Sequence, residues 1–390
     1  MNFFLKYGIG IYLSITLLYK LYFLIPLSFI SSLYYFIMVI GLILVFKRYQ
    51  RKSIVGYAKS FKYLFSVLLL NLLYLLIFGG NTESILYWFA KLATTNLIVF
   101  GIVSNYNFYE RVFIKYFKYI ILVIILIGYM FGVSDEIING DVNRLSMGFN
   151  PNDLGLFSAL GALAIMLFNK TWYKSKIDGI LFFVFCLLTL LSGSKAALLN
   201  LVVGILLIYG ISFKLVVFSI SLWGVFLLTP KLNYTTSIDR LLSKESAFET
   251  RNEVFEIGLL TFDDSFWTGH GIDKYGWTDP KYWSSPEEML GPHNTYLSIG
   301  IMYGVIFGSI FIFLLLIQVI KSLRIFLNKH SSFVKFSALI VILSVINGFF
   351  ESLIVGVNEF VSVLFWFAVG VVSYSYSLSS RNIKLNFKKY

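Results

Sequence analysis

Residues 294–320, NTYLSIGIMYGVIFGSIFIFLLLIQVI, contain no charged side chain and are long enough to cross a ~30 Å hydrocarbon layer as a helix. Similar apolar runs recur along the whole chain, which is 58% hydrophobic and only 13% charged, whereas a soluble domain carries about a quarter charged residues. Because lipid cannot satisfy backbone hydrogen bonds, the runs are expected to be helices, and their continuity argues against the alternating strands of a barrel. The sequence predicts an all-α polytopic membrane protein.

We predict about twelve transmembrane helices, with both termini in the cytoplasm. This orientation places 22 of the 32 basic residues inside but only two of the 20 acidic ones, in agreement with the positive-inside bias. The net charge of +12 then reflects a cytoplasmic rim that faces anionic lipid headgroups, and it requires no nucleic acid partner. The first apolar run lacks a cleavage site and is expected to be retained. The predicted spans are 7–26, 28–46, 63–79, 85–103, 116–133, 153–169, 179–193, 196–211, 213–229, 294–320, 336–356 and 359–379.

One long polar loop, Lys231 to His293, is predicted to lie outside the membrane, so that the chain divides into 1–229, 230–293 and 294–390. Residues 249–260 have apolar side chains at helical spacing, which predicts a short amphipathic helix with Arg251 on its polar face. The later part of the loop is rich in Trp and Tyr, including Trp267. Such side chains suit either the interfacial belt of a membrane protein or the stacking of sugar rings.

The loop ends in Gly-Pro-His-Asn, where His293 and Asn294 enter the tenth span. Histidine exchanges protons near neutral pH, and the dipole at a helix N-terminus favours its neutral form, which is competent as a base. Asn294 suits the N-cap of the helix. His293 is therefore either a general base or a residue that hydrogen-bonds the backbone of a capping turn. His270, earlier in the loop, is a second candidate base.

Isolated cations occur in two other outer turns. Arg144 precedes a Pro151 turn that predicts a helix N-terminus, and a simple ion pair with a neighbouring acid is the alternative interpretation. Lys195 follows Ser-Gly-Ser and opposes the charge bias, so it either snorkels to the interface or binds an anion at the start of the next helix. Glu351, near the outer end of the eleventh span, is either a functional intramembrane acid or the partner of a core cation.

Motifs of a metal enzyme such as HExxH or paired CxxC do not occur in the sequence. Two adjacent acids, Asp263 and Asp264, lack the further ligands that a metal-bound diphosphate requires and are interpreted as a solvated turn. No metal or other cofactor is predicted.

In their order along the chain, these segments resemble the Wzy-type O-antigen polymerase and O-antigen ligase family. The resemblance covers roughly residues 140–310. One departure is Lys195, where the family usually has arginine, because lysine keeps the charge but loses bidentate phosphate geometry. The matching segments are 144–152, the turn 191–198, the helix with Arg251, the run 267–272, and 293–297 followed by Gly300 and Gly304.

The resemblance implies a GT-C-like, inverting and metal-independent glycosyltransferase with its site at the outer face of the cytoplasmic membrane. Its reaction would join undecaprenyl-diphosphate-linked repeat units into O-antigen, capsular or exopolysaccharide. Implied partners are the lipid-linked donor and acceptor, the bilayer, a chain-length regulator and a flippase. The candidate catalytic residues are His293 as the general base and Arg144, Lys195 and Arg251 as cations for the diphosphate. The candidate substrate-binding residues are Asn294, His270, Tyr296, Trp267 and Glu351.

Three alternatives stay open. A ligase that transfers the finished glycan to a lipid core or other acceptor shares the fold and the motifs. A flippase for lipid-linked oligosaccharide also has many spans, but such transporters usually show two related halves, and here the polar residues cluster on one face. The third alternative is a structural membrane partner that uses the long loop as a docking surface.

Overall fold

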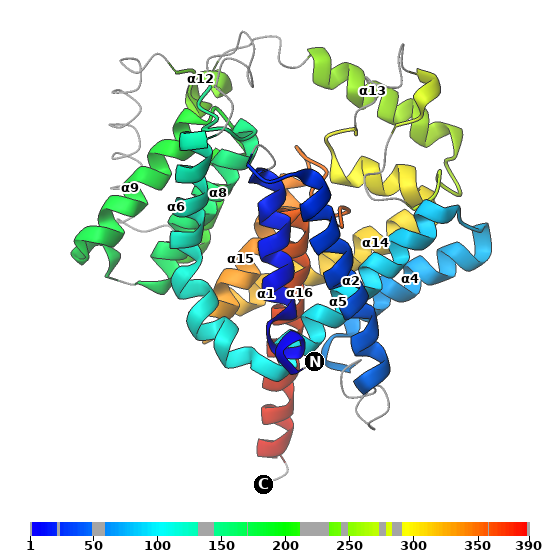
Figure 1. The fold of residues 1–390 in the computed structure, drawn as a ribbon, viewed down its shortest axis with the longest axis horizontal. Coiled ribbons are helices and arrows are strands. Elements are labelled where there is room, and N and C mark those ends of the chain that lie inside the picture. Colours follow the sequence, from blue (N-terminus) through cyan, green and yellow to red (C-terminus); the bar gives the residue numbers. More distant parts are fainter. Residues whose placement is uncertain are drawn as a thin grey trace.

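The computed structural model describes residues 2–21, 24–48, 59–131, 144–169, 171–210, 234–242, 249–272, 278–282, 291–357 and 359–387. Every regular element in these ranges is a helix (Figure 1). The α-helices are α1 (Asn2–Leu18), α2 (Leu27–Arg48), α4 (Lys62–Phe78), α5 (Thr82–Phe108), α6 (Ile114–Phe131), α8 (Pro151–Phe168), α9 (Lys176–Leu191), α10 (Lys195–Tyr209), α12 (Ser237–Leu242), α13 (Glu249–Asp264), α14 (Thr295–Leu327), α15 (Ser332–Asn347) and α16 (Phe360–Phe387). Short turns of other helix types are η1 (Tyr19–Leu21), η2 (Tyr109–Phe113), η3 (Trp172–Lys174) and η5 (Pro280–Tyr282).

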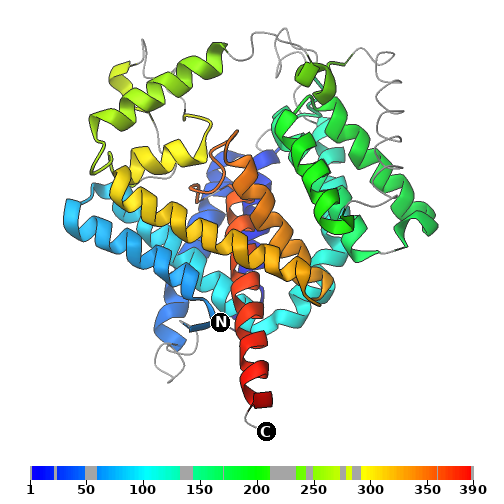
Figure 2. The same cartoon turned by 180° about the vertical axis from the view of Figure 1, so that it is seen from behind.

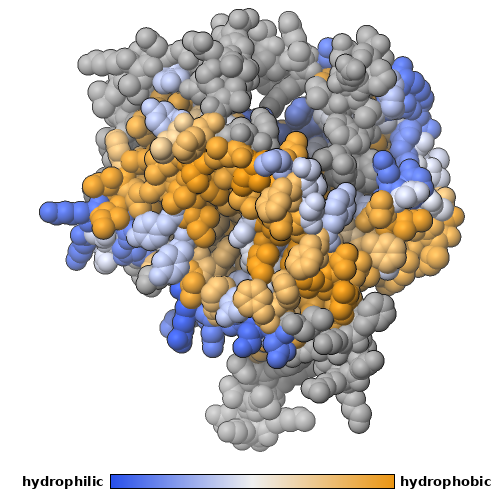
Figure 3. Space-filling model, viewed as in Figure 1, coloured by the Kyte–Doolittle hydropathy of each residue, from blue (hydrophilic) through white to orange (hydrophobic). Residues whose placement is uncertain are grey.

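The helices have the length and composition of membrane spans. Five of them are long and apolar enough to cross a bilayer, within α2, α5 with η2, α8, α14 and α16, and four shorter apolar helices accompany them. Figure 3 shows hydrophobic residues across the middle of one face and hydrophilic residues along its lower edge. The membrane class and the all-helical fold are thereby confirmed. The number twelve stays a prediction, and the ninth predicted span, 213–229, lies outside the described residues.

Helices α14, α15 and α16 lie between two other groups of helices. Helix α16 packs against α1, α4 and α5, while α15 packs against α8 and α10. Figures 1 and 2 show α12 and α13 at the end of the molecule opposite the C-terminus. Several helices begin with side-chain caps at their N-terminal ends, such as Asn150 on α8 and Ser194 on α10. These caps fix where the helices start and so position the turns before them.

Helix α14 is broken at Gly304, which has φ +65° and ψ −176°. A Cβ atom on Gly308 would lie only 3.5 Å from the carbonyl oxygen of Ile299, although eight or nine residues of straight helix span more than about 12 Å. The arm Thr295–Tyr303 therefore folds back on the remainder of α14. The predicted span 294–320 therefore contains a reversal at Gly304, which average hydropathy does not register within an apolar run.

The glycine-flanked turn of the long loop closes this break. The amide of Val305 donates to the carbonyl of Phe266 (2.8 Å), and the amide of His270 donates to that of Ile301 (2.7 Å). A Cβ atom on Gly269 would lie 2.5 Å from the amide nitrogen of Gly304. Only glycine fits this contact, so the loop and the broken helix are built as one unit.

Helix α15 ends at Asn347, and residues 348–357 are irregular, so the predicted eleventh span, 336–356, is too long. The carbonyls of this segment are satisfied by side chains from other helices. Tyr87 donates to Val355 (2.9 Å) and Lys91 to Gly356 (2.9 Å). Irregular backbone at membrane depth is stable where protein covers it or where it lines a cavity. This segment carries Glu351.

Candidate functional site

His293 lies directly before α14 and contacts Glu351 from the irregular segment. Its Nδ1 is 3.2 Å from Oε2 of Glu351. Because an ionised carboxylate only accepts hydrogen bonds, Nδ1 must donate, and Nε2 is then the basic nitrogen of the ring. Thr295 fixes the segment in place, since its hydroxyl donates to the carbonyl of Glu351 (2.8 Å) and accepts from the amide of Leu353 (3.1 Å). The predicted residues His293 and Glu351 thus pair as a histidine base and the carboxylate that orients it.

Asn152 joins this pair to the predicted cation Arg144. Its Nδ2 donates to Oε1 of Glu351 (2.8 Å), and its Oδ1 accepts from Nη2 of Arg144 (2.9 Å). From the sequence, Asn152 belongs only to the segment 144–152, and it lies in the first turn of α8. The contact with Glu351 crosses between distant parts of the chain, so nothing in the local sequence indicated it.

The turn between α9 and α10 is held by two arginines. Nε of Arg144 donates to the carbonyl of Ser192 (2.9 Å), and Nη1 of Arg240 donates to that of Gly193 (2.9 Å). Gly193 has φ +64°, and a Cβ atom there would lie 2.9 Å from Nε of Arg144. Lys195 begins α10 directly after this turn and is partly exposed. Three basic residues therefore gather at one turn, and Arg240 was not among the predicted cations.

Two residues beside the site have left-handed backbone. Met147 has φ +48° and His293 has φ +46°, and within the described ranges no other residue except glycine has positive φ. This conformation costs a side-chain-bearing residue about 1–3 kcal/mol and tends to occur where function holds it. His293 is the first member of the chain of contacts that ends at Arg144, and Met147 lies three residues after Arg144.

The two other predicted site residues at the start of the tenth span, Asn294 and Tyr296, make structural contacts. Asn294 caps α14, because its Oδ1 accepts from the amides of Tyr296 (2.9 Å) and Leu297 (3.0 Å). The hydroxyl of Tyr296 donates to the carbonyl of Val345 (2.6 Å), and its ring lies 4.6 Å from that of Phe349. Both residues position the entrance to α14.

His270 is placed apart from His293, in the turn that closes the α14 break. Its Nε2 lies 2.7 Å from the carbonyl oxygen of Thr261, which can only accept, so this nitrogen carries a proton and is not basic. Trp267 is 64% exposed and is available for contact with lipid or sugar. Arg251 lies in α13, where an amphipathic helix was predicted, but its side chain lies outside the described part of the structure.

Asp263 and Asp264 are predicted to form a solvated turn, and the structure pairs Asp264 with a cation. Single ligand atoms of Asp264, His270 and Asp279 lie within 4.8 Å of one another. The ammonium of Lys281 already lies 2.5 Å from Asp264 and 3.7 Å from Asp279. Hydrogen bonds from Lys281 and from Tyr282 lower the pKa of Asp264. A lysine thus supplies the positive charge that these acids require.

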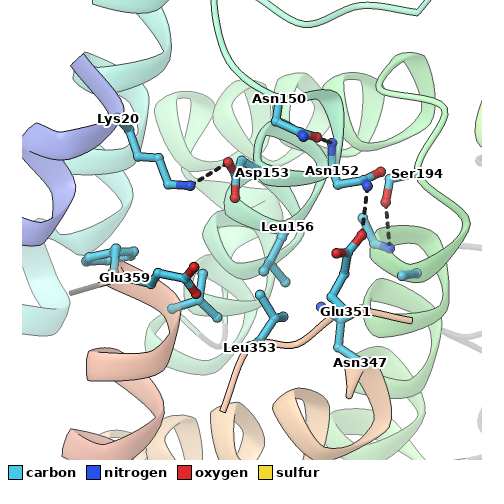
Figure 4. A pocket seen from close by; sticks show the side chains of 14 residues that line it. Lys20, Asn150, Asn152, Asp153, Leu156, Ser194, Asn347, Glu351, Leu353 and Glu359 are labelled. Carbon is cyan, nitrogen blue, oxygen red and sulfur yellow. Dashed lines mark hydrogen bonds and ion pairs between the residues drawn. The ribbon is translucent and has the colours of Figure 1, made fainter. Parts of the chain in front are cut away.

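A cavity of about 210 Å³ is lined by Glu351, the partner of His293 (Figure 4). Its walls come from the start of α8, the start of α10, the irregular segment and Lys20 of η1. Nζ of Lys20 is 2.6 Å from Oδ2 of Asp153. Lys20, Asp153 and Glu359 were not among the predicted site residues. Their signal was a charged side chain at the end of an apolar span.

Residues 180–313 match a family model described as O-antigen ligase. This segment is similar to the O-antigen ligase family. The matched segment runs from α9 into α14 and contains Lys195, Arg251 and His293. A search of curated proteins found no match. The match confirms the resemblance drawn from the sequence and supports a polymerase-type or ligase-type role in glycan assembly.

Proposed function

We propose that the protein is an inverting glycosyltransferase that polymerises glycan repeat units carried on undecaprenyl diphosphate, at the outer face of the cytoplasmic membrane. The observation that carries this proposal is the continuous set of contacts from His293 through Glu351 and Asn152 to Arg144. It joins a base to a fixed cation, and transfer from a diphosphate donor needs both. The match to the O-antigen ligase family supports the same chemistry.

In the proposed reaction, an acceptor hydroxyl attacks the anomeric carbon of the donor sugar while the bond to the diphosphate oxygen breaks. The hydroxyl proton passes to Nε2 of His293, because Nδ1 is engaged by Glu351. General-base assistance of this kind contributes about 10²–10⁴-fold. Glu351 orients the ring and stabilises the imidazolium that forms, as a carboxylate does in other acid–base triads. Attack opposite the leaving group inverts the anomeric centre.

The leaving diphosphate gains charge, and fixed cations would stabilise it. Arg144 and Lys195 lie at the turn between α9 and α10, and Arg251 is the third proposed cation. Cations held in place before the reaction stabilise developing charge without reorganisation at the moment of reaction. We therefore assign these residues, rather than a metal ion, to the leaving group.

A ligase is the second candidate, because the matching family model is described as O-antigen ligase. A size-resolved gel of surface and lipid-linked glycan separates the candidates in cells that lack the gene. Unextended single repeats at the outer face would establish a polymerase. Long polymer that stays on its lipid carrier would establish a ligase, and repeats trapped at the inner face would indicate a transporter.

The role of His293 is tested by His293→Ala in the same cells. We expect the glycan pattern of the gene deletion at normal protein abundance. Polymer of normal length and attachment would defeat the assignment. If deletion of the gene abolishes the polymer but every site variant still makes it, the protein is a structural partner instead.

A further inference from the structure

The short helix α12 is held by contacts with a helix that lies far from it in the sequence. Its six residues are fewer than a helix needs to be stable alone in water. At its start, the hydroxyl of Thr236 donates to Oδ2 of Asp239 (2.6 Å) and accepts from the amide of Asp239 (3.1 Å). The buried hydroxyl of Ser237 lies 3.1 Å from the carbonyl oxygen of Thr189 and 3.2 Å from that of Leu190. Helix α12 therefore packs on the last turn of α9 (Figure 1).

Arg240 extends this contact to the turn that follows α9. Its Nη1 donates to the carbonyl of Gly193 (2.9 Å). A Cβ atom on Gly193 would lie 3.0 Å from the carbonyl oxygen of Thr235, so the residue before the cap of α12 also touches the turn. A charged donor makes a stronger hydrogen bond than a neutral one, and a cation suits the negative end of the α9 dipole. The long loop thus holds Gly193 at two points.

The same turn positions two of the proposed diphosphate cations. Lys195 begins α10 two residues after Gly193. Nε of Arg144 donates to the carbonyl of Ser192 (2.9 Å), and its Nη2 donates to Oδ1 of Asn152 (2.9 Å). The guanidinium of Arg144 is therefore oriented by the turn through one nitrogen and by Asn152 through another. A shift of the turn would displace both cations, and a misplacement of about 1 Å can cost about 10²-fold in rate.

We infer that Arg240 is a positioning residue for the transfer reaction and that it holds the turn Ser192–Lys195 in place from the long loop. Its guanidinium acts through the carbonyl of Gly193 and not on the substrate. The inference rests on the proposed function, because the turn matters for rate only if its cations stabilise the leaving diphosphate. It gives the loop segment before α13 a role separate from those proposed for Arg251 and His293.

The test measures transfer by the purified full chain in lipid nanodiscs, with lipid-linked glycan and membrane lipid extracted from cells that lack the gene as substrates. Arg240→Met removes the charge and the donors, and we expect the maximal rate to fall about 10–100-fold, as misplaced groups predict. Arg240→Lys retains a charged donor and should recover part of the rate. The matched control is Arg324→Met, which removes an exposed arginine near the C-terminal end of α14 and should leave the rate unchanged.

A double-mutant cycle with Lys195→Met separates positioning from a general loss of stability. If Arg240 acts through the turn, Arg240→Met should lower the rate by a smaller factor in the Lys195→Met background than in the wild type. The reason is that one of the cations that it positions is already absent, which makes the two effects non-additive. Equal factors in the two backgrounds, a wild-type rate for Arg240→Met, or no recovery in Arg240→Lys would overturn the inference.

Ser237→Ala keeps the inference testable if Arg240→Met does not reach the membrane. It removes the hydroxyl that joins α12 to α9 but keeps Arg240, so the rate should fall by a smaller factor with the same dependence on Lys195. A wild-type rate for Ser237→Ala would then count against the inference. Active Arg240→Met protein beside inactive His293→Ala protein would remove only the positioning role, whereas glycan unchanged by deletion of the gene would remove the proposed function.

Discussion

Glu351 is the residue through which the base and the cation of the site are connected. It accepts hydrogen bonds from both His293 and Asn152, so its two oxygens have different partners. Glu351→Gln keeps the shape of the side chain but replaces one acceptor oxygen with a donor NH₂ group. We expect the transfer rate at saturating acceptor to fall about 10–100-fold, within the range of general-base assistance.

A positioning role for Glu351 has a specific kinetic result. The maximal rate should fall further than the acceptor affinity, and Glu351→Asp should recover part of the rate because it restores a carboxylate. Glu110→Gln in η2 serves as the control for a general effect of removing an acid. Equal activity of Glu351→Gln and the wild type in a reconstituted transfer assay would exclude the role.

Substitution of Lys195 distinguishes a side chain that binds an anion from one that only snorkels to the membrane interface. If it stabilises the diphosphate, Lys195→Met should lower transfer by roughly 10²-fold or more, as loss of a preorganised charge-stabilising donor does. Lys195→Arg keeps the charge and should retain most of the activity. If the side chain only snorkels, both variants should transfer glycan at the wild-type rate in the same assay.

The break in α14 depends on two glycines that contact each other. Gly304→Ala introduces a Cβ atom 2.5 Å from the backbone of Trp267 and strains a φ of +65°. We expect a loss of about 1–3 kcal/mol from the backbone strain alone and more from the clash. The measurement is the thermal unfolding midpoint of the purified protein in detergent.

Two other glycines serve as controls for this prediction. Gly210 has the same φ, +65°, but a Cβ atom there meets nothing within 4 Å, so Gly210→Ala isolates the strain. Gly291 has neither feature, and Gly291→Ala should leave the midpoint unchanged. A midpoint for Gly304→Ala no lower than that of Gly210→Ala would mean that the loop does not close on the break.

The helices themselves were largely predictable, while their interruptions were not. A membrane span requires an apolar run, and within the described part of the chain every predicted span contains a helix. The reversal at Gly304 depends on a contact with Gly269 across the fold, and the irregular segment after Asn347 depends on donors such as Lys91 in α5. Such features arise from tertiary contacts, which local composition does not record.

The candidate site shows the same division. His293 and Glu351 were both predicted as site residues, because a histidine at a helix N-terminus can serve as a base and an acid within a membrane span is energetically costly. The structure brings the two side chains together. Asn152 and Glu359 were missed, since an amide in the first turn of a helix and an acid at a span boundary each have ordinary local explanations. Their importance depends on the cavity that they share with Lys20.

At the scale of the whole molecule, the proposed chemistry requires the site to face outward. The basic bias predicts that α13 lies outside and that the turn between α14 and α15 lies inside. The single cysteine, Cys186, is buried, so a Cys186→Ala background carries no reactive thiol. Glu256→Cys in α13 and Lys329→Cys in the α14–α15 turn then report the two faces, because both positions are exposed.

We expect a membrane-impermeant maleimide to label Glu256→Cys in intact cells and Lys329→Cys only after permeabilisation. The Cys186→Ala parent should stay unlabelled in both conditions. The reverse pattern would place His293 and the cavity in the cytoplasm, where lipid-linked units flipped to the outer face are out of reach. Labelling of both positions from outside would contradict the predicted topology between α13 and α15, and with it the count of spans.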